Sequence, residues 1–456
     1  MFAIPGIVAL LVQAYLRPQE YFLQLQTVPL LYLFLGLALF GLAVDVKLRH
    51  TQLVASPLLG WVLAFIGWSL FTLALRLPSG LQTAMTDFMI PFTFFLLLSQ
   101  GVQRFRALAI IATTVLLIGL FLSFVGVHQG ISPFGCFKLD PEARDASGTW
   151  DGRSCVNEAE CTGGDAEPDA DYACERVGLL GTSSVGGGRV RYRGALNDPN
   201  ELALTLAVGL PIAFAFFERK RSGGRLLLLG LTLALIGGCV FLTGSRGGQL
   251  VFLSVLAVYF VKRYGPRGLA VVAVCALPML ALSGGRSDAD ASSQERLEML
   301  HSAMQLFRWY PGRGVGYAQI MEYQPLTAHN SYALAAAELG FPGLVIFTAL
   351  LYLPFKMLLT IERRYAEDRV AAVARIWAIA LRASMTGMCI GIFFLSFCYH
   401  QIIWIYWGLV GAVYQCARTH DPKLDVSLDR GDLTRIVLID IGLVVMMTVY
   451  TALKVK

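Results

Sequence analysis

The sequence predicts an all-α polytopic membrane protein with about 12 transmembrane helices, or 13 if a last charged segment also spans, and two long loops on the non-cytoplasmic side. Hydrophobic residues make up 56% of the chain and charged residues 15%, with a mean hydropathy of +0.61. Soluble domains are about 45–50% apolar and about 25% charged. The apolar residues also gather in many long runs, which core helices of soluble proteins rarely contain.

Windows of about 20 residues locate the expected membrane-spanning segments. In chain order these are 2–16, 28–44, 53–75, 83–99, 107–127, 199–217, 225–243, 248–262, 267–283, 341–360, 376–396 and 401–416. The first lacks a basic start and a cleavage site, so we expect a retained helix. A further apolar segment, 434–452, contains Arg435 and Asp440, and the sequence leaves open whether it spans.

These segments divide the chain into five regions. They are N-terminal transmembrane helices (1–127), a cysteine-containing loop (128–198), central transmembrane helices (199–283), a second long loop expected to be catalytic (284–340), and C-terminal helices with a tail (341–456).

The distribution of Lys and Arg predicts the orientation. Alternate short loops are rich in basic residues, whereas the opposite short loops carry only Arg17, Arg76 and Arg246. Because basic residues concentrate in cytoplasmic loops, we expect the N-terminus in the cytoplasm. Loops 128–198 and 284–340 then face the other side, together with Arg246. The net charge of +6 thus belongs to cytoplasmic loops and does not indicate a nucleic-acid partner.

Four of the nine cysteines lie in the first long loop: Cys136, Cys155, Cys161 and Cys174. An even set in a polar segment favours one or two disulfides in an oxidising compartment, and four unlinked thiols are the alternative. Residues 140–190 contain few apolar side chains and are expected to bury little core. We therefore expect a stapled or mobile insertion.

Arg246 lies in the sequence Thr-Gly-Ser-Arg-Gly-Gly (243–248), between two apolar segments. Its flanking glycines give the planar guanidinium room to meet phosphate oxygens. The alternative is an arginine that extends from the membrane to the interface, which is common. The scarcity of positive charge in the other outer short loops favours phosphate binding.

The second long loop contains apolar residues at 297, 300, 303, 304 and 307, a helical period that predicts an amphipathic helix. Arg296 is expected near its start, where a bound anion would also meet the helix N-terminus. Ordinary ion pairs of Arg296 with Glu295 and Glu298 are an equally supported alternative.

Two more motifs follow in this loop. Arg313 lies in a glycine-rich turn, Tyr-Pro-Gly-Arg-Gly-Val-Gly-Tyr (310–317), which is not a dinucleotide fingerprint because no strand precedes it. His329 lies in Thr-Ala-His-Asn-Ser-Tyr (327–332), where a histidine is a candidate general base near neutral pH. A structural histidine beside a capping Asn330 is the alternative.

Several other chemistries lack their sequence signatures. The sequence has no His/Cys cluster with zinc spacing and no glycine-rich loop ending in Lys-Ser/Thr, so we expect neither a metal nor a cofactor. Charges within the apolar segments are few, with Arg382 the clearest. No chain of carboxylates for ion coupling is therefore evident.

Several short motifs follow one another in a definite order along the chain. Arg-Gly-Ala-Leu-Asn-Asp-Pro-Asn-Glu-Leu-Ala (193–203) precedes the Arg246 motif, an arginine-initiated helix, Pro-x-Arg-Gly-Val-Gly-Tyr, and Ala-His-Asn-Ser-Tyr with Glu-Leu-Gly-x-Pro-Gly. This order, over about residues 190–345, resembles the O-antigen ligase and O-antigen polysaccharide polymerase family. Arg313 departs from the apolar residue expected before Gly-Val-Gly, and the insertion 136–185 is not part of the family pattern.

The resemblance implies a glycosyltransferase at the periplasmic face of a bacterial inner membrane. Its donor would be an undecaprenyl-pyrophosphate-linked glycan, and its acceptor lipid A–core for a ligase or another carrier-linked glycan for a polymerase. Arg246, Arg296 and His329 would be catalytic, the arginines holding the pyrophosphate and the histidine deprotonating the acceptor hydroxyl, with inversion and without a metal. The substrate-binding candidates are Arg193, Asn200, Arg313 and Asn330.

Two other functions stay open at this point. A transporter or flippase of lipid-linked sugars would need polar residues along a path at the membrane midplane, and few are evident. A catalytically idle scaffold in an export complex is the third possibility. Ligase and polymerase are not separated, because acceptor choice depends on cavity shape.

Overall fold

The computed structural model describes residues 1–139, 148–163, 166–167, 170–282, 289–366 and 372–454, and every predicted apolar segment forms a helix. The helices are α1 (Ala3–Leu16), α2 (Leu30–Lys47), α3 (Pro57–Arg76), α4 (Leu81–Gly101), α5 (Phe105–Ile131), α6 (Glu158–Cys161), α7 (Pro199–Arg219), α8 (Gly223–Leu242), α9 (Arg246–Tyr264), α10 (Gly268–Leu282), α11 (Ala289–Trp309), α12 (Ser331–Arg364), α13 (Ala372–Gly391), α14 (Gln401–His420) and α15 (Arg430–Lys454). Short 3-10 turns lie at Pro18–Glu20, Leu23–Leu25, Pro78–Gly80, Leu179–Gly181, Gly194–Leu196, Gly265–Arg267 and Ile320–Glu322.

In the described part of the chain, nine helical segments are long and apolar enough to cross a membrane. They are α2, α3, α4 with the turn before it, α5, α7, α8, α12, α13 and α15. Of the other expected spans, α1 and α10 have 14 and 15 residues, whereas α9 and α14 are long enough but less apolar. The protein is thus an all-α polytopic membrane protein, and its segment 434–452 qualifies as a span although α9 and α14 do not.

Apolar side chains on the outside of these helices identify lipid as their surroundings. On α8, Leu227 is 67% exposed and Leu231 60%, and on α15 Leu438 is 62% exposed. Continuous surfaces of this kind promote aggregation in water, whereas the hydrocarbon core of a bilayer matches them. Helices satisfy their own backbone hydrogen bonds, so they tolerate this environment.

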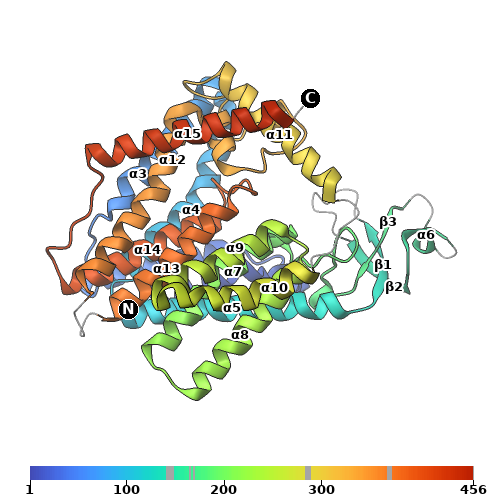
Figure 1. Cartoon of the computed structure of the whole chain (residues 1–456), viewed down its shortest axis with the longest axis horizontal. Coiled ribbons are helices and arrows are strands. Elements are labelled where there is room, and N and C mark those ends of the chain that lie inside the picture. The colour runs from blue at the N-terminus through green and yellow to red at the C-terminus, as the bar shows by residue number, and fades with distance from the viewer. Residues whose placement is uncertain (140–147, 164–165, 168–169, 283–288, 367–371, 455–456) are drawn as a thin grey trace. The chain divides into compact units, whose positions relative to one another are not determined.

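The chain folds into two compact units. The α12 unit comprises Met1–Ile7, Leu37–Ile110 and Gly284–Lys456; in it α12 packs against α3, α11, α13, α14 and α15. The α9 unit comprises Val8–Gly36 and Ile111–Ser283; in it α9 packs against α7, α8 and α10 (Figure 1).

Two charged groups within the helices of the α12 unit have polar partners. Asp440, which made the last segment doubtful, accepts a hydrogen bond of 2.6 Å from the Thr348 hydroxyl. Arg382 forms an ion pair of 2.7 Å with Glu362. Pairing lowers the free-energy cost of burying polar groups in an apolar setting, so these residues are compatible with helices that span the membrane.

The insertion of the α9 unit contains a small sheet that the sequence did not predict. Strands β1 (Phe134–Leu139), β2 (Gly148–Ser154) and β3 (Tyr172–Arg176) pair antiparallel in the order β2-β1-β3. Disulfides join Cys136 to Cys161 and Cys155 to Cys174, and these cysteines form a small core with Tyr172. Covalent links stabilise the strands where large apolar side chains are scarce.

Candidate functional site

The turn that presents Arg246 lies between α8 and α9 in the α9 unit. Gly244 adopts a left-handed conformation with φ of 61°, which glycine adopts without steric cost. Ser245 then caps α9, its hydroxyl accepting a hydrogen bond of 3.0 Å from the Gly248 amide. Arg246 is the first residue of the helix and its side chain is exposed. The guanidinium is therefore available to a ligand at a helix N-terminus, where anions are favoured.

Arg189, which sequence reasoning did not identify, contacts this turn. Its Nε donates a hydrogen bond of 2.9 Å to the Thr243 carbonyl, and its Nη2 donates one of 3.4 Å to Oδ1 of Asn200. Asn200 is 8% exposed and its amide also donates to Asp198. The only signal for Arg189 in the sequence is its place shortly before the Arg-Gly-Ala-Leu-Asn-Asp-Pro-Asn motif.

Arg193 is held by protein groups. Its guanidinium donates to the carbonyls of Glu20, at 3.3 Å, and of Gly181, and it lies 5.4 Å from the centre of the Tyr21 ring. These contacts join the segment after α1 to the segment before α7. They favour a role in holding the loop over the predicted role in substrate binding.

Arg296 lies on α11 in the α12 unit and is partly exposed. The predicted amphipathic helix is confirmed, since Ala303, Met304 and Phe307 are buried. The helix is already formed at Ala289, seven residues or about 10 Å before Arg296. The helix dipole acts mainly within the first turn. The prediction that an anion bound by Arg296 would also meet the helix N-terminus is therefore wrong.

His329 lies at the sharp turn that leads into α12. Its φ is 48°, a left-handed conformation that costs a non-glycine residue about 1–2 kcal/mol. Asn330 follows as the helix cap and is 5% exposed. Its Oδ1 accepts hydrogen bonds from the amides of Tyr332 (2.9 Å) and Ala333 (3.0 Å). These bonds favour a capping role for Asn330 over substrate binding.

The next residue, Ser331, anchors the histidine turn to the segment after α13. Its hydroxyl donates a hydrogen bond of 2.6 Å to the Leu395 carbonyl and accepts one of 2.7 Å from the Phe397 amide. Its own amide donates to the Ile392 carbonyl at 2.8 Å. Ser331 is fully buried and holds the backbone next to His329 against residues 392–397. Sequence reasoning did not identify it.

The first part of α12, from Ser331 to Leu339, ends against the glycine-rich turn. α12 is interrupted at Gly340, so the carbonyls of residues 337–339 lose their helical partners. In order, they accept hydrogen bonds from the Val315 amide (2.9 Å), the Gly316 amide (2.9 Å) and the Trp68 indole (2.8 Å). We call residues 310–317 the glycine clasp. The expected boundary at 340/341 is thus a kink in a helix that begins at Ser331.

Arg313 lies on this clasp and is exposed. Beside it, Gly314 has a φ of 67°, and a Cβ there would lie 2.2 Å from the carbonyl carbon of Glu338. Such an approach requires glycine. The clasp therefore sets the position of the Arg313 backbone while the side chain projects from the turn.

Tyr317, the last residue of the clasp, and Glu338 of α12 are both buried. Glu338 is 1% exposed, and its Oε1 accepts a hydrogen bond of 3.1 Å from the Ile320 amide. Burial, and then the charges of Asp87 and Glu338, raise the pKa of Tyr317 above its usual range. A tyrosine in this state stays neutral at physiological pH.

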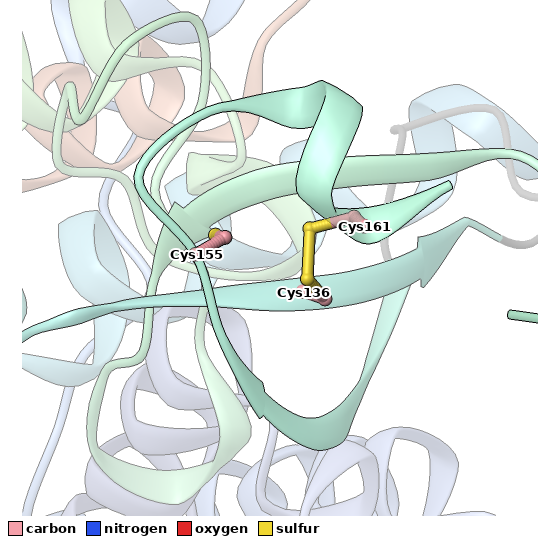
Figure 2. Close-up of side chains that lie close together, drawn as sticks. All are labelled: Cys136, Cys155 and Cys161. Carbon is pink, nitrogen blue, oxygen red and sulfur yellow. A yellow bond between two sulfur atoms is a disulfide. The ribbon is translucent and has the colours of Figure 1, made fainter. Parts of the chain in front are cut away.

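The grouped cysteines of the insertion do not form a metal site. Sγ atoms of Cys136, Cys155 and Cys161 lie within 4.8 Å of one another. Figure 2 shows the bond between the sulfur atoms of Cys136 and Cys161, with Cys155 nearby. Each of them is in a disulfide, whereas zinc requires thiolates. The two neighbouring disulfides account for the cluster.

Comparison with known proteins bears on the segment that carries most of these residues. Residues 231–348 match the family model described as O-antigen ligase. The match supports the O-antigen ligase family for this segment. It runs from α8 into α12 and includes Arg246, Arg296, Arg313, His329 and Asn330. The O-antigen ligase segment thus contributes residues to both units.

Two further comparisons add little. No curated protein matches the chain. A solved structure described as "Structural coordination of polymerization and crosslinking by a peptidoglycan synthase complex" is 15% identical, with a TM-score of 0.44. The similarity covers 82% of this chain and 100% of that one. At that score and identity the likeness does not extend to activity.

Proposed function

We propose that this protein transfers a glycan from an undecaprenyl-pyrophosphate carrier to an acceptor sugar of a surface polysaccharide, as a ligase or a polymerase. The reaction takes place at the periplasmic face of a bacterial inner membrane. The observation that carries this proposal is the match of residues 231–348, the O-antigen ligase segment, to that family model. It contains the three residues to which the resemblance gives catalytic roles, set among membrane-spanning helices.

In this proposal Arg246 and Arg296 bind the pyrophosphate of the donor. Guanidinium groups pair with phosphate oxygens in a planar, two-pronged geometry. As the bond between the anomeric carbon and the phosphate oxygen breaks, negative charge grows on the leaving pyrophosphate. Two fixed cations stabilise that charge in the transition state, so no divalent metal is required. The exposure of Arg246 at the start of α9 supports its part in this step.

His329 acts on the acceptor. Its imidazole accepts the proton of the acceptor hydroxyl while the oxygen bonds to the anomeric carbon. Attack occurs opposite the departing pyrophosphate and inverts that carbon. The left-handed backbone at His329 supports this role, because strained conformations at non-glycine residues concentrate at functional sites.

Single substitutions test the proposal in a strain that depends on this gene. Arg246→Ala, Arg296→Ala and His329→Ala are each expected to abolish long-chain surface polysaccharide while the protein still inserts into the membrane. Arg308→Ala is the matched control, because Arg308 is an exposed arginine on the same helix as Arg296. Normal polymer in all three variants would overturn the proposal.

Gene deletion separates the two forms of the activity. Loss of long chains from lipid A alone indicates a ligase, whereas single unpolymerised repeats on lipid A indicate a polymerase. Purified protein reconstituted in vesicles tests the transporter alternative. Movement of labelled carrier lipid across the bilayer without formation of a glycosidic bond would favour a flippase and contradict glycan transfer.

A further inference from the structure

We propose that Arg189 is a positioning residue that fixes the turn carrying Arg246. This inference rests on the proposed function, since it assigns to Arg189 the orientation of a donor-binding arginine. Arg189 lies outside all of the family-like sequence motifs. Every contact that carries the inference lies within the α9 unit.

The first contact holds the backbone of the turn. Arg189 Nε donates to the Thr243 carbonyl at 2.9 Å, three residues before Arg246. The next amide along, that of Val190, donates to the Leu242 carbonyl at 3.2 Å. Two successive carbonyls at the end of α8, which lack helical donors at a helix C-terminus, are therefore bound by the 189–190 segment.

The second contact is steric. A Cβ built at Gly244 would lie 3.5 Å from Cγ and from Nε of Arg189. The arginine side chain therefore packs directly against the left-handed residue of the turn. This packing, together with the Ser245 cap, restricts how the chain enters α9, and hence the direction in which the Arg246 side chain leaves the helix.

The third contact links the turn to another helix. Arg189 Nη2 donates to Asn200 Oδ1 at 3.4 Å, and Asn200 lies in the first turn of α7. The guanidinium thus bridges the Arg246 turn and the start of α7. Asn200, predicted to bind substrate, acts in this arrangement through Arg189.

Arginine suits this task because its donors point in several fixed directions within one plane. A lysine at this position has a single ammonium on a flexible stem, and can replace one of the two hydrogen bonds at a time. Arg189→Lys is therefore a partial rescue variant, and Arg189→Ala removes both bonds. Arg191 is the matched control, because its Nε donates to the Ser183 carbonyl (3.2 Å), outside the turn.

The test measures glycan transfer by the full-length protein in membrane vesicles, with donor and acceptor varied separately. Arg189→Ala is expected to lower kcat/KM for the donor about 10- to 100-fold, the scale of a small misplacement of a binding group. The KM for the acceptor is expected to stay unchanged. Arg189→Lys should recover part of the loss, and Arg191→Lys should leave the donor parameters unchanged.

A double-mutant cycle shows whether Arg189 acts through Arg246. In an Arg246→Lys background, Arg189→Ala is expected to cause little further loss, because residues that act as a unit are non-additive. Binding of a C15 prenyl pyrophosphate, measured without acceptor, should show the same pattern.

Two results would overturn this inference and leave the proposed function intact. One is that Arg189→Ala lowers kcat/KM for the donor equally in the wild-type and Arg246→Lys backgrounds. The other is that Arg189→Ala impairs the kinetic parameters of donor and acceptor alike, together with a lowered melting temperature. An Arg246→Lys protein that transfers glycan normally would instead contradict the proposed function, and the inference with it.

Discussion

The turns before α9 and α12 have the same three-residue arrangement, but the candidate catalytic residue occupies a different position in each. A left-handed residue comes first, a capping residue second and the first helical residue third. In the α9 unit these are Gly244, Ser245 and Arg246. In the α12 unit His329, Asn330 and Ser331 occupy the same three places.

The difference lies in where each turn puts its candidate catalytic side chain. At α9 the left-handed residue is glycine, which adopts that conformation freely, and the arginine follows in regular helical geometry. At α12 the histidine itself is left-handed, and the first helical residue is a fully buried serine. One turn therefore exposes a cation without backbone strain, whereas the other holds a strained histidine with buried hydrogen bonds.

Substitution of the histidine gives the largest expected effect. His329→Ala and His329→Gly should both reduce glycan transfer at least ~100-fold, the lower range for loss of a general base. The glycine variant should be more stable than the alanine variant by about 1 kcal/mol, because only glycine adopts the left-handed conformation without penalty. Transfer assays and thermal unfolding measure the two effects. Activity retained in the glycine variant would mean that the backbone, not the imidazole, is required.

Removal of the buried serine hydroxyl should have the next largest effect. Ser331→Ala leaves the Phe397 amide without its acceptor, and an unpaired buried donor costs about 1–3 kcal/mol. Reduced resistance to thermal unfolding in detergent is the expected result. Arg246→Ala changes the equivalent position of α9 and should leave stability nearly unchanged, since that side chain is exposed. Equal destabilisation by both substitutions would contradict the comparison.

A smaller effect is expected from the left-handed glycine. Gly244→Ala should destabilise the α9 unit by about 1–2 kcal/mol, through the left-handed penalty. Gly244→Asn is the control, because asparagine tolerates this conformation better than other residues. Similar unfolding temperatures for the two variants would show that Arg189 contacts, and not the backbone conformation, limit this position.

Changes to the two caps should have the smallest effects. Ser245→Ala and Asn330→Ala are each expected to cost about 1 kcal/mol, the usual value of a helix cap. Asn330→Asp keeps the accepting oxygen and should change stability by only about a few tenths of that amount. Hydrogen exchange at the first turns of α9 and α12 would measure each cap separately, and unchanged exchange in the alanine variants would contradict the assigned role.

Two of the predicted site residues have protein partners that the sequence did not indicate. Arg193 and Asn200 lie in the motif at 193–203, which predicts substrate binding, and their side chains bind Glu20, Gly181 and Arg189. A motif identifies residues that matter but does not say whether they contact a ligand or hold a neighbour.

Local patterns in the sequence determined the helices of this protein. Long apolar runs predicted every membrane-type helix, and the period of 297–307 predicted the buried face of α11. The cysteine count predicted disulfides in the insertion without their pairing. The position of Asn330 beside His329 already allowed a capping interpretation.

Tertiary structure decided what depends on partners far apart in the chain. The sheet of the insertion needed the pairing of β1 with both β2 and β3. The kink at Gly340 is stable because Trp68, 271 residues away from Leu339, supplies a donor together with the glycine clasp. The left-handed His329 is held by Ser331 bonds to residues 392–397. Helical periodicity depends on residues close together in the sequence, whereas hydrogen bonds between distant segments form only when the whole chain has folded.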